Sequence, residues 1–244
     1  MKKVKRNISS LFAIIAAFVF ANPLTAQDYK EDMLKIRAAF KTKCHSFSIK
    51  YLYYPYDSVK KATDSINGTC IVDSEYWYYK IKSSSGVVEY LKNEKYFVEV
   101  NHPNKVIMIG KSSIAKTDLW NINKVDSLLR LPTMKITYKE KNGKGEYEIR
   151  LDSSGSWNRM KLVFNKENFT IEEIWLYSAA KGKIFGEPYN KPVIGIFYSA
   201  YRVTPPGKSD FSEGKFVQKT KDGKFEGVGN FKEFELLDYV NKKT

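Results

Sequence analysis

The chain of 244 residues contains only two cysteines and two histidines, and this scarcity excludes several classes of protein. Two cysteines cannot build the dense disulfide framework of small secreted domains. Two histidines cannot form a three-histidine metal site, which leaves His45 and His102 with carboxylates as the remaining alternative. We expect neither a metal ion nor any other cofactor.

The sequence also lacks the short motifs that carry familiar chemistry. It contains no G-x-x-x-x-G-K-[ST], C-x-x-C, H-E-x-x-H or G-x-S-x-G pattern. On an extended segment, the adjacent Cys44 and His45 would point to opposite faces and could not pair as nucleophile and base. Glu75, Glu89 and Glu99 could converge as glycosidase carboxylates do, but 27 acidic residues make such a coincidence ordinary. We expect no enzymatic activity and keep a secreted hydrolase only as an alternative.

Long apolar runs are missing except near the N-terminus. Four basic residues lie between Lys2 and Arg6, and the uncharged run Leu11–Ala21 follows them. This run of 11 residues is shorter than the ~20 that a membrane-spanning helix needs. Residues 1–26 are therefore predicted to be a secretory signal peptide, cleaved after Ala26 or Gln27. Since no cysteine comes directly after the cleavage site, where a lipid anchor would need one, we expect a soluble periplasmic protein whose residues 27–244 form a single domain.

Acidic residues are in deficit, with 27 Asp and Glu against 41 Lys and Arg. Loss of the signal peptide removes four basic and no acidic residues, so the mature chain keeps a net charge of about +10. In an exported protein this charge favours an anionic membrane surface over nucleic acid as a partner. Because the lysines are scattered along the chain, a purely solubilising role is equally compatible with the sequence.

Two segments have helical periodicity. Tyr29, Met33, Ile36 and Phe40 recur at spacings of four, three and four, which predicts an amphipathic helix over about 28–42. The same periodicity in Leu119, Ile122, Val125 and Leu129 predicts a second helix over about 118–130.

Most of the remaining chain alternates between apolar and polar residues, as half-buried antiparallel strands do. The clearest alternation is in Phe47, Ile49, Tyr51 and Tyr53, and again in Trp77, Tyr79 and Ile81. Asn142-Gly143 is the strongest hairpin signal, and Asn67-Gly68, Ser85-Gly86 and Asp222-Gly223 are further turn candidates. About ten strands are expected, which favours a curled sheet or an incomplete barrel over a flat one.

A hairpin turn near residue 60 would place Cys70 opposite about Tyr53. Cys44 would then lie about nine residues further along its strand. At ~3.3 Å per residue this separation exceeds the ~7 Å that a disulfide can span. The sequence therefore favours two unpaired thiols.

The order of elements resembles that of the LolA-like family of periplasmic lipoprotein carriers. The resemblance covers residues 27–244 and rests on this order together with the aromatic segments Phe47–Tyr56 and Tyr76–Tyr79. It implies an α+β fold, in which a curled, mainly antiparallel sheet or incomplete β-barrel packs on an N-terminal helix and a mid-chain helix. It also implies an apolar cavity that accepts acyl chains.

The resemblance makes a non-enzymatic carrier or chaperone for a lipid acyl chain or a lipidated protein the leading hypothesis, in a chain that we expect to be a monomer. Candidate cavity-lining residues are apolar and aromatic positions of the two predicted helices and of the aromatic strands: Met33, Ile36, Phe40, Phe47, Ile49, Tyr51, Tyr53, Trp77, Tyr79, Leu119, Ile122 and Leu129. The alternative is an envelope module that binds a glycan or a protein through an exposed aromatic face, because tyrosines occupy both faces of these strands.

Overall fold

The computed structural model describes residues 26–41, 45–56, 61–73, 76–114, 135–150, 157–179, 182–184, 187–189, 191–203, 207 and 209–241. The predicted second helix, over 118–130, and the predicted signal peptide up to residue 25 lie outside these residues. Within them, no helix is long and apolar enough to cross a membrane.

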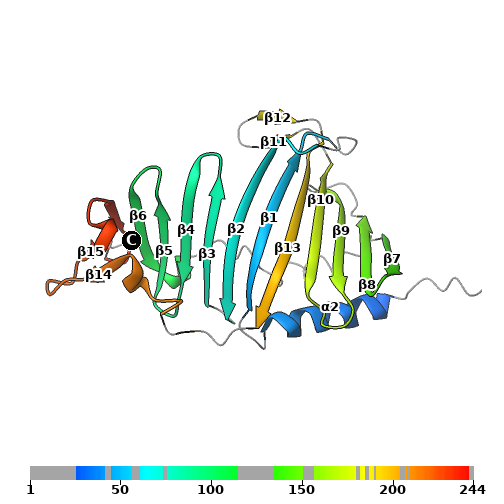
Figure 1. The fold of residues 1–244 in the computed structure, drawn as a ribbon, viewed down its shortest axis with the longest axis horizontal. Helices are drawn as coiled ribbons and strands as arrows, with labels where there is room; N and C mark the ends of the chain where they lie inside the picture. Colours follow the sequence, from blue (N-terminus) through cyan, green and yellow to red (C-terminus); the bar gives the residue numbers. More distant parts are fainter. Residues whose placement is uncertain are drawn as a thin grey trace, which may run out of the picture.

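The described part of the chain contains one α-helix, sixteen strands and three short 3-10 helices, at Ser112–Ile114, Glu213–Lys215 and Gly229–Phe231 (Figure 1). The helix α2 spans Ala26–Lys41, close to its predicted bounds. The strands are β1 (His45–Tyr54), β2 (Asp64–Asp73), β3 (Tyr76–Ser83), β4 (Gly86–Lys92), β5 (Tyr96–Asn101), β6 (Val106–Lys111), β7 (Lys135–Lys141), β8 (Lys144–Arg150), β9 (Trp157–Asn165), β10 (Ile171–Ser178), β11 (Gly182–Ile184), β12 (Glu187–Tyr189), β13 (Val193–Val203), β14 (Val217–Lys219), β15 (Phe225–Gly227) and β16 (Glu235–Asp238).

Twelve of the strands form one sheet in the order β16-β6-β5-β4-β3-β2-β1-β13-β10-β9-β8-β7. All neighbours are antiparallel except β16, which runs parallel to β6. Strand β13 lies between β1 and β10 and so joins two meanders into one sheet. The strands β11 and β12 pair with each other, as do β14 and β15.

The turn residues explain part of this order. Asn142 and Gly143 adopt φ values of 54° and 73° between β7 and β8, as the favoured two-residue hairpin turn requires. Gly86 and Gly223, at φ 119° and 83°, confirm two further predicted turns. Asn67-Gly68 is not a turn, because both residues lie inside β2 and pair with β1 and β3.

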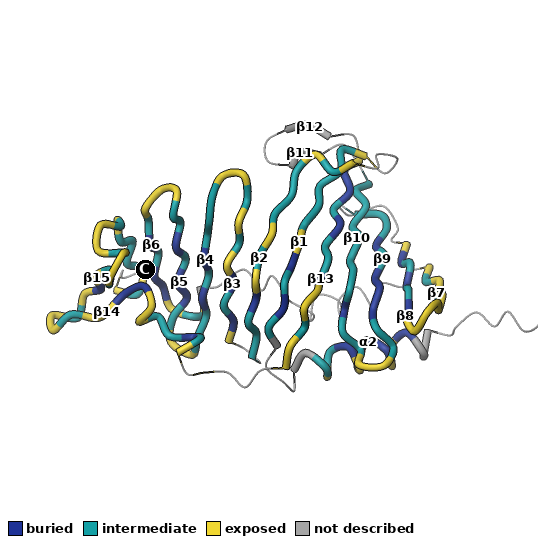
Figure 2. Tube along the Cα trace, in the orientation of Figure 1, coloured by how far each residue is buried: buried dark blue, intermediate teal, exposed yellow. Residues whose placement is uncertain are grey.

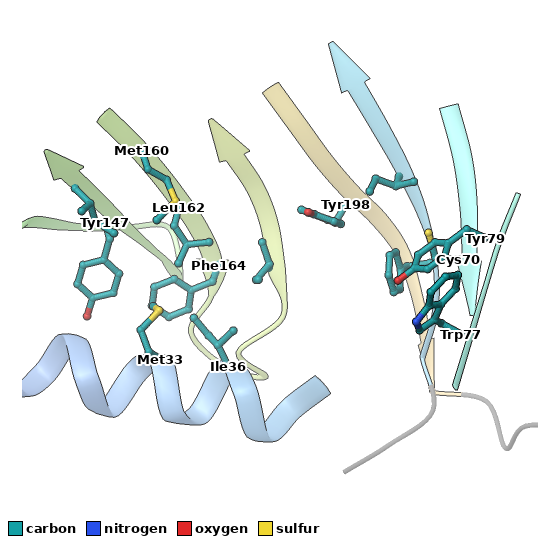
Figure 3. Packing of buried hydrophobic residues seen from close by; sticks show 14 of the residues in the cluster. Met33, Ile36, Cys70, Trp77, Tyr79, Tyr147, Met160, Leu162, Phe164 and Tyr198 are labelled. Carbon is teal, nitrogen blue, oxygen red and sulfur yellow. The ribbon is translucent and has the colours of Figure 1, made fainter. Parts of the chain in front are cut away.

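The curled sheet has two unlike faces, which we call inner and outer. The inner face is the one against which α2 packs, and it carries the larger core cluster, with side chains from β1, β2, β3, β5, β8, β9, β10 and β13 (Figure 3). The predicted α+β class and the curled, mainly antiparallel sheet are confirmed, and the sheet stays open. The estimate of about ten strands was too low, because the sheet alone contains twelve.

The outer face of β4–β6 is covered by the C-terminal segment 209–241. Phe216, Val217 and Phe225 of this segment are buried against Val98 and Val100 of β5 in a second core cluster. Strand β5 is therefore buried on both faces, with Phe97 on the inner face and Val98 and Val100 on the outer face. Figure 2 shows the buried positions continuing along β4, β5 and β6 beneath this segment.

The observed hairpin register corrects the position expected for Cys70. Cys70 pairs with Phe47 and not with a residue near Tyr53. The thiol is free and 1% exposed, so it packs as a small apolar side chain. Cys44 lies outside the described residues.

Candidate functional site

The inner face is apolar across most of its width because cross-strand partners there are apolar. Phe47 pairs with Cys70, and Cys70 pairs with Tyr79. These three side chains are at most 3% exposed, and Trp77 lies 4.9 Å from Tyr79 between ring centroids. These rings form a buried aromatic layer on this part of the inner face.

A second zone of the inner face, nearer the β11–β12 end of the sheet, is apolar but only half-buried. Tyr51 pairs with Ile66 on one side and with Ile196 on the other, and Ile196 pairs with Ile174. Tyr53 pairs with Ile194, which pairs with Leu176. We call these half-buried side chains the inner apolar patch: Tyr51, Tyr53, Ile66, Ile174, Leu176, Ile194 and Ile196.

The structure brings most of the described candidate lining residues to the inner face. Met33 and Ile36 of α2 are buried in the same cluster as Phe47, Ile49, Trp77 and Tyr79, and Tyr51 packs against that cluster. Tyr53 is half-buried at the end of β1. Nothing is described of the Phe40 side chain, and Leu119, Ile122 and Leu129 lie outside the described residues.

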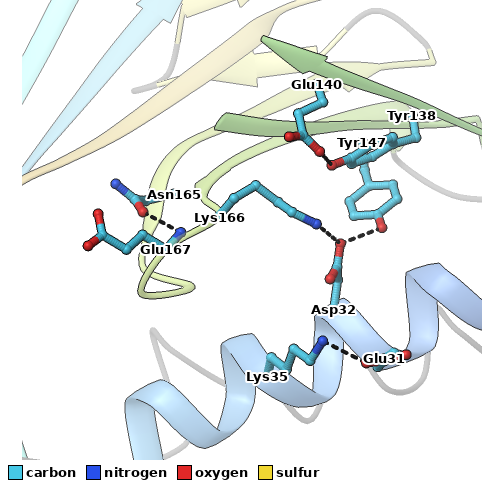
Figure 4. Close-up of polar contacts among 9 residues, drawn as sticks. All are labelled: Glu31, Asp32, Lys35, Tyr138, Glu140, Tyr147, Asn165, Lys166 and Glu167. Atoms are coloured by element: carbon cyan, nitrogen blue, oxygen red, sulfur yellow. Dashed lines mark hydrogen bonds and ion pairs between the residues drawn. The ribbon is translucent and has the colours of Figure 1, made fainter. Parts of the chain in front are cut away.

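Helix α2 is positioned by a polar contact that the sequence pattern did not reveal. Asp32 is only 6% exposed, and the Tyr147 hydroxyl donates a hydrogen bond of 2.8 Å to its Oδ2 atom (Figure 4). The Lys166 ammonium lies 3.5 Å from the same oxygen. Tyr29 packs edge-on against Tyr147, with ring centroids 4.9 Å apart. The helix is therefore held over β8 and the end of β9.

Hydroxyl groups at the inner face remain neutral. Burial raises the pKa of Tyr51 well above its ordinary value, and burial followed by the charge of Asp64 raises the pKa of Tyr53. At neutral pH both side chains offer a neutral hydroxyl and an apolar ring. A surface of this kind suits an apolar ligand with a polar end group.

The arrangements considered for catalysis do not assemble in the described part of the chain. Glu89 pairs with Val100 and Tyr90 pairs with Glu99, so Glu89 and Glu99 lie on opposite faces of the sheet and do not converge. His102 Nε2 lies 2.8 Å from Glu89 Oε1 in a contact that fastens the β5–β6 turn to β4. In the described part of the chain, no three metal-binding side chains come close enough to hold an ion. Glu75 lies outside the described residues.

Two pockets lined by described residues lie away from the inner apolar patch. One, of about 410 Å³, lies between the C-terminal segment and the ends of β2, β3 and β5, with Asp73, Tyr76 and Phe211 in its wall. The other, of about 360 Å³, lies at the rim of the sheet beside Arg159 and Tyr177.

No protein-family model matches the chain, and no curated protein matches it significantly. Solved structures with a similar fold include an uncharacterised conserved protein from Thermus thermophilus, at 6% identity and a TM-score of 0.49, which covers 86% of this chain and 99% of its own. A LolA superfamily protein from Nitrosomonas europaea has 12% identity and a TM-score of 0.36 over 76% and 97% of the two chains. MucB has 10% identity and a TM-score of 0.44, and the match covers 81% of this chain and 68% of the MucB chain. MucB has also been solved in complex with MucA(peri). LolA-like proteins are thus among the similar structures, as the element order indicated.

Proposed function

We propose that the chain is a periplasmic, non-enzymatic carrier or chaperone that shelters an acyl chain, free or attached to a lipidated protein, on its inner face. The observation that carries the proposal is the inner apolar patch, whose seven aromatic or branched side chains are only partly buried on the inner surface of a curled sheet. Apolar side chains that remain partly accessible side by side can form a binding site.

The patch offers enough apolar surface for a useful affinity. Burial of an acyl chain contributes ~0.8 kcal/mol per CH₂ group, so about twelve groups contribute ~10 kcal/mol. Association costs at least ~4 kcal/mol, which leaves an affinity in the micromolar range or weaker. Such binding is reversible, as a carrier requires.

The cellular setting belongs to the same proposal. Export through the signal peptide at residues 1–26 would place the basic chain next to anionic membrane surfaces. We take residues 27–244 to act as one monomeric domain, with Leu119, Ile122 and Leu129 of the predicted second helix contributing to the same apolar site.

The experiment compares two tyrosines of one strand that face opposite ways. Tyr51 lies on the inner face of β1 and Tyr54 on the outer face, and both are half-buried. We expect the mature protein to bind a fluorescent fatty acid, Tyr51→Lys to weaken that binding at least tenfold, and Tyr54→Lys to leave it within about twofold. Unfolding midpoints of both variants control for folding. Failure of the unmodified protein to bind the probe, or equal losses in both variants, would contradict the proposal.

A specific observation supports a second candidate, an envelope module that binds a glycan or a protein on the outer face. Tyr54, Trp175 and Phe197 are half-buried there, with ring centroids 5.8 Å apart for the first pair and 5.2 Å for the second. Aromatic rings arranged in this way can stack on sugars or anchor a protein partner. If Tyr54→Lys abolishes retention on envelope glycans while acyl probes never bind, this second function replaces the first.

A further inference from the structure

The outer face of the sheet carries a row of three like charges at its β7 end. Lys135 of β7 pairs with Arg150 of β8, which pairs with Arg159 of β9. Arg159 pairs in turn with Tyr177 of β10. Like charges placed directly opposite each other on neighbouring strands are destabilising. We call Lys135, Arg150 and Arg159 the cationic row.

Neighbouring rows of the same face are built differently. In the next row Glu148 pairs with Lys161, and in the row after that Lys139 pairs with Glu146. The Lys161 ammonium also lies 3.2 Å from a Glu146 carboxylate oxygen. Alternating charge is therefore the rule on this part of the face, and the cationic row departs from it.

A pocket of about 360 Å³ opens beside the cationic row. Its wall comes from β8, β9, β10 and the start of β13 and contains three cations, three neutral polar side chains and one valine, with no carboxylate among the described lining residues: Arg150, Asn158, Arg159, Tyr177, Ser178, Lys191 and Val193. Volumes of ~300 Å³ and above accept small ligands or the head groups of larger ones.

The Arg159 guanidinium is already oriented at this pocket. Its central carbon lies 3.6 Å from the centroid of the Tyr177 ring, so the planar group stacks on the aromatic face. The Arg150 side chain is oriented by Glu148, because the Arg150 Nε atom donates a hydrogen bond of 3.1 Å to the Glu148 Oε1 atom. This bond occupies the Nε donor of the Arg150 guanidinium group. A guanidinium fixed in this way loses little freedom when it binds an oxyanion through two parallel hydrogen bonds.

We propose that this pocket binds the phosphate group of a phosphate-bearing ligand, with Arg150 and Arg159 as the principal contacts and Lys191 as a further positive charge. The pocket wall brings three positive charges together with no carboxylate among its described lining residues, and the two guanidinium groups supply the planar geometry that phosphate recognition uses. The ligand is either a soluble phosphate ester or the head group of a phospholipid. This site lies on the opposite face from the inner apolar patch and does not depend on the proposed carrier function.

The test measures binding of the mature protein to glycerol 3-phosphate by calorimetry and to vesicles of phosphatidylglycerol in phosphatidylcholine by sedimentation. The variant Arg150→Gln/Arg159→Gln is matched with Lys139→Gln/Lys141→Gln, which removes two charges from β7 outside the pocket. We expect the arginine pair to weaken binding at least tenfold and the lysine pair to change it by less than about twofold. Arg159→Lys, which keeps the charge but loses the fork, should resemble the glutamine variant in the calorimetric arm.

Each outcome decides the question. Binding of both probes, lost in the arginine pair, supports the site with a soluble phosphate ester as its ligand, whereas binding of vesicles alone supports a phospholipid head group. Binding of neither probe, or equal weakening in the two double variants, would overturn the site in favour of unspecific surface charge. Arg150→Gln alone repeats the comparison if the double variant fails to fold, because Arg150 is an exposed side chain.

Discussion

The buried carboxylate of Glu89 should stabilise the fold in a way that depends on pH. Glu89 is 6% exposed on the outer face of β4, and three side chains contact it. The Tyr78 hydroxyl donates a hydrogen bond to one oxygen, while His102 Nε2 and the Lys80 ammonium lie 2.8 and 3.4 Å from the other. The His102 ring packs edge-on against Phe231 and Phe234 of the C-terminal segment. Loss of the carboxylate should therefore loosen that segment.

The expected loss in the free energy of unfolding depends on which Glu89 contacts the amide of Glu89→Gln retains. Glu89→Gln keeps the shape and an oxygen that can accept from Tyr78, but it loses the charge that Lys80 and His102 face. Hydrogen bonds to charged groups contribute ~1.5–3 kcal/mol each, and Lys80 is half-exposed to solvent, so we expect a loss of about 1–2 kcal/mol in the free energy of unfolding at pH 7.

The pH dependence has a definite sign. Burial by itself would raise the pKa of Glu89, but the hydrogen bonds from Tyr78 and His102 and the charge of Lys80 outweigh it and hold the pKa below its usual value. The contribution of Glu89 is therefore present above the unfolded-state pKa of about 4.3 and is lost as the pH falls through the lower native value. The unmodified protein should lose stability more steeply than Glu89→Gln in this acid range.

Glu99 on the neighbouring strand is the matched control. Its pKa is raised by burial, so its charged form is disfavoured in the native state. Glu99→Gln should leave stability at pH 7 unchanged or higher. Urea unfolding at pH 7 and pH 4, followed by tryptophan fluorescence, compares the two variants. Equal losses in both, or acid slopes that Glu89→Gln does not alter, would refute this reasoning.

Two further predictions concern packing. A Cβ atom on Gly145 would lie 2.4 Å from the Phe164 ring, so Gly145→Ala should displace that ring beneath α2 and lower the free energy of unfolding by about 1–3 kcal/mol; a thermal melt unchanged within 1 °C would count against it. Burial raises the pKa of the Cys70 thiol, so in a Cys44→Ser background Cys70 should resist a thiol reagent at pH 8 in the folded protein and react in urea; rapid labelling of the folded protein would contradict the structure.

Local patterns in the sequence predicted those parts of the fold that depend on neighbours along the chain. Helix α2 follows from the spacing of Tyr29, Met33 and Ile36, and the β7–β8 hairpin follows from Asn142-Gly143. The prediction of a turn at Asn67-Gly68 is wrong, because glycine occurs both in turns and in strands that approach a neighbour closely. Gly68 lies within β2, where an added Cβ would lie 3.0 Å from the Lys80 carbonyl oxygen and 3.1 Å from the Ile49 side chain, so glycine eases a close approach between strands there.

Long-range pairing limited what the sequence could show of the site. Alternation correctly placed Phe47, Ile49, Trp77 and Tyr79 on one face, but it could not show that Ile196 pairs with Tyr51, because β13 follows β1 by more than a hundred residues. The inner apolar patch therefore became visible only with the register. In the same way, the three opposed cations of the cationic row belong to three different strands, and their scattered positions in the sequence resemble ordinary surface charge.

The most direct test of the central claim is native mass spectrometry of the protein purified gently from the cells that make it, followed by denaturing extraction of whatever accompanies it. The account predicts a co-purifying lipid or acylated peptide that is retained in Tyr54→Lys and lost in Tyr51→Lys. A protein that emerges without any such ligand, and that takes up no fatty acyl probe afterwards, would contradict the carrier function.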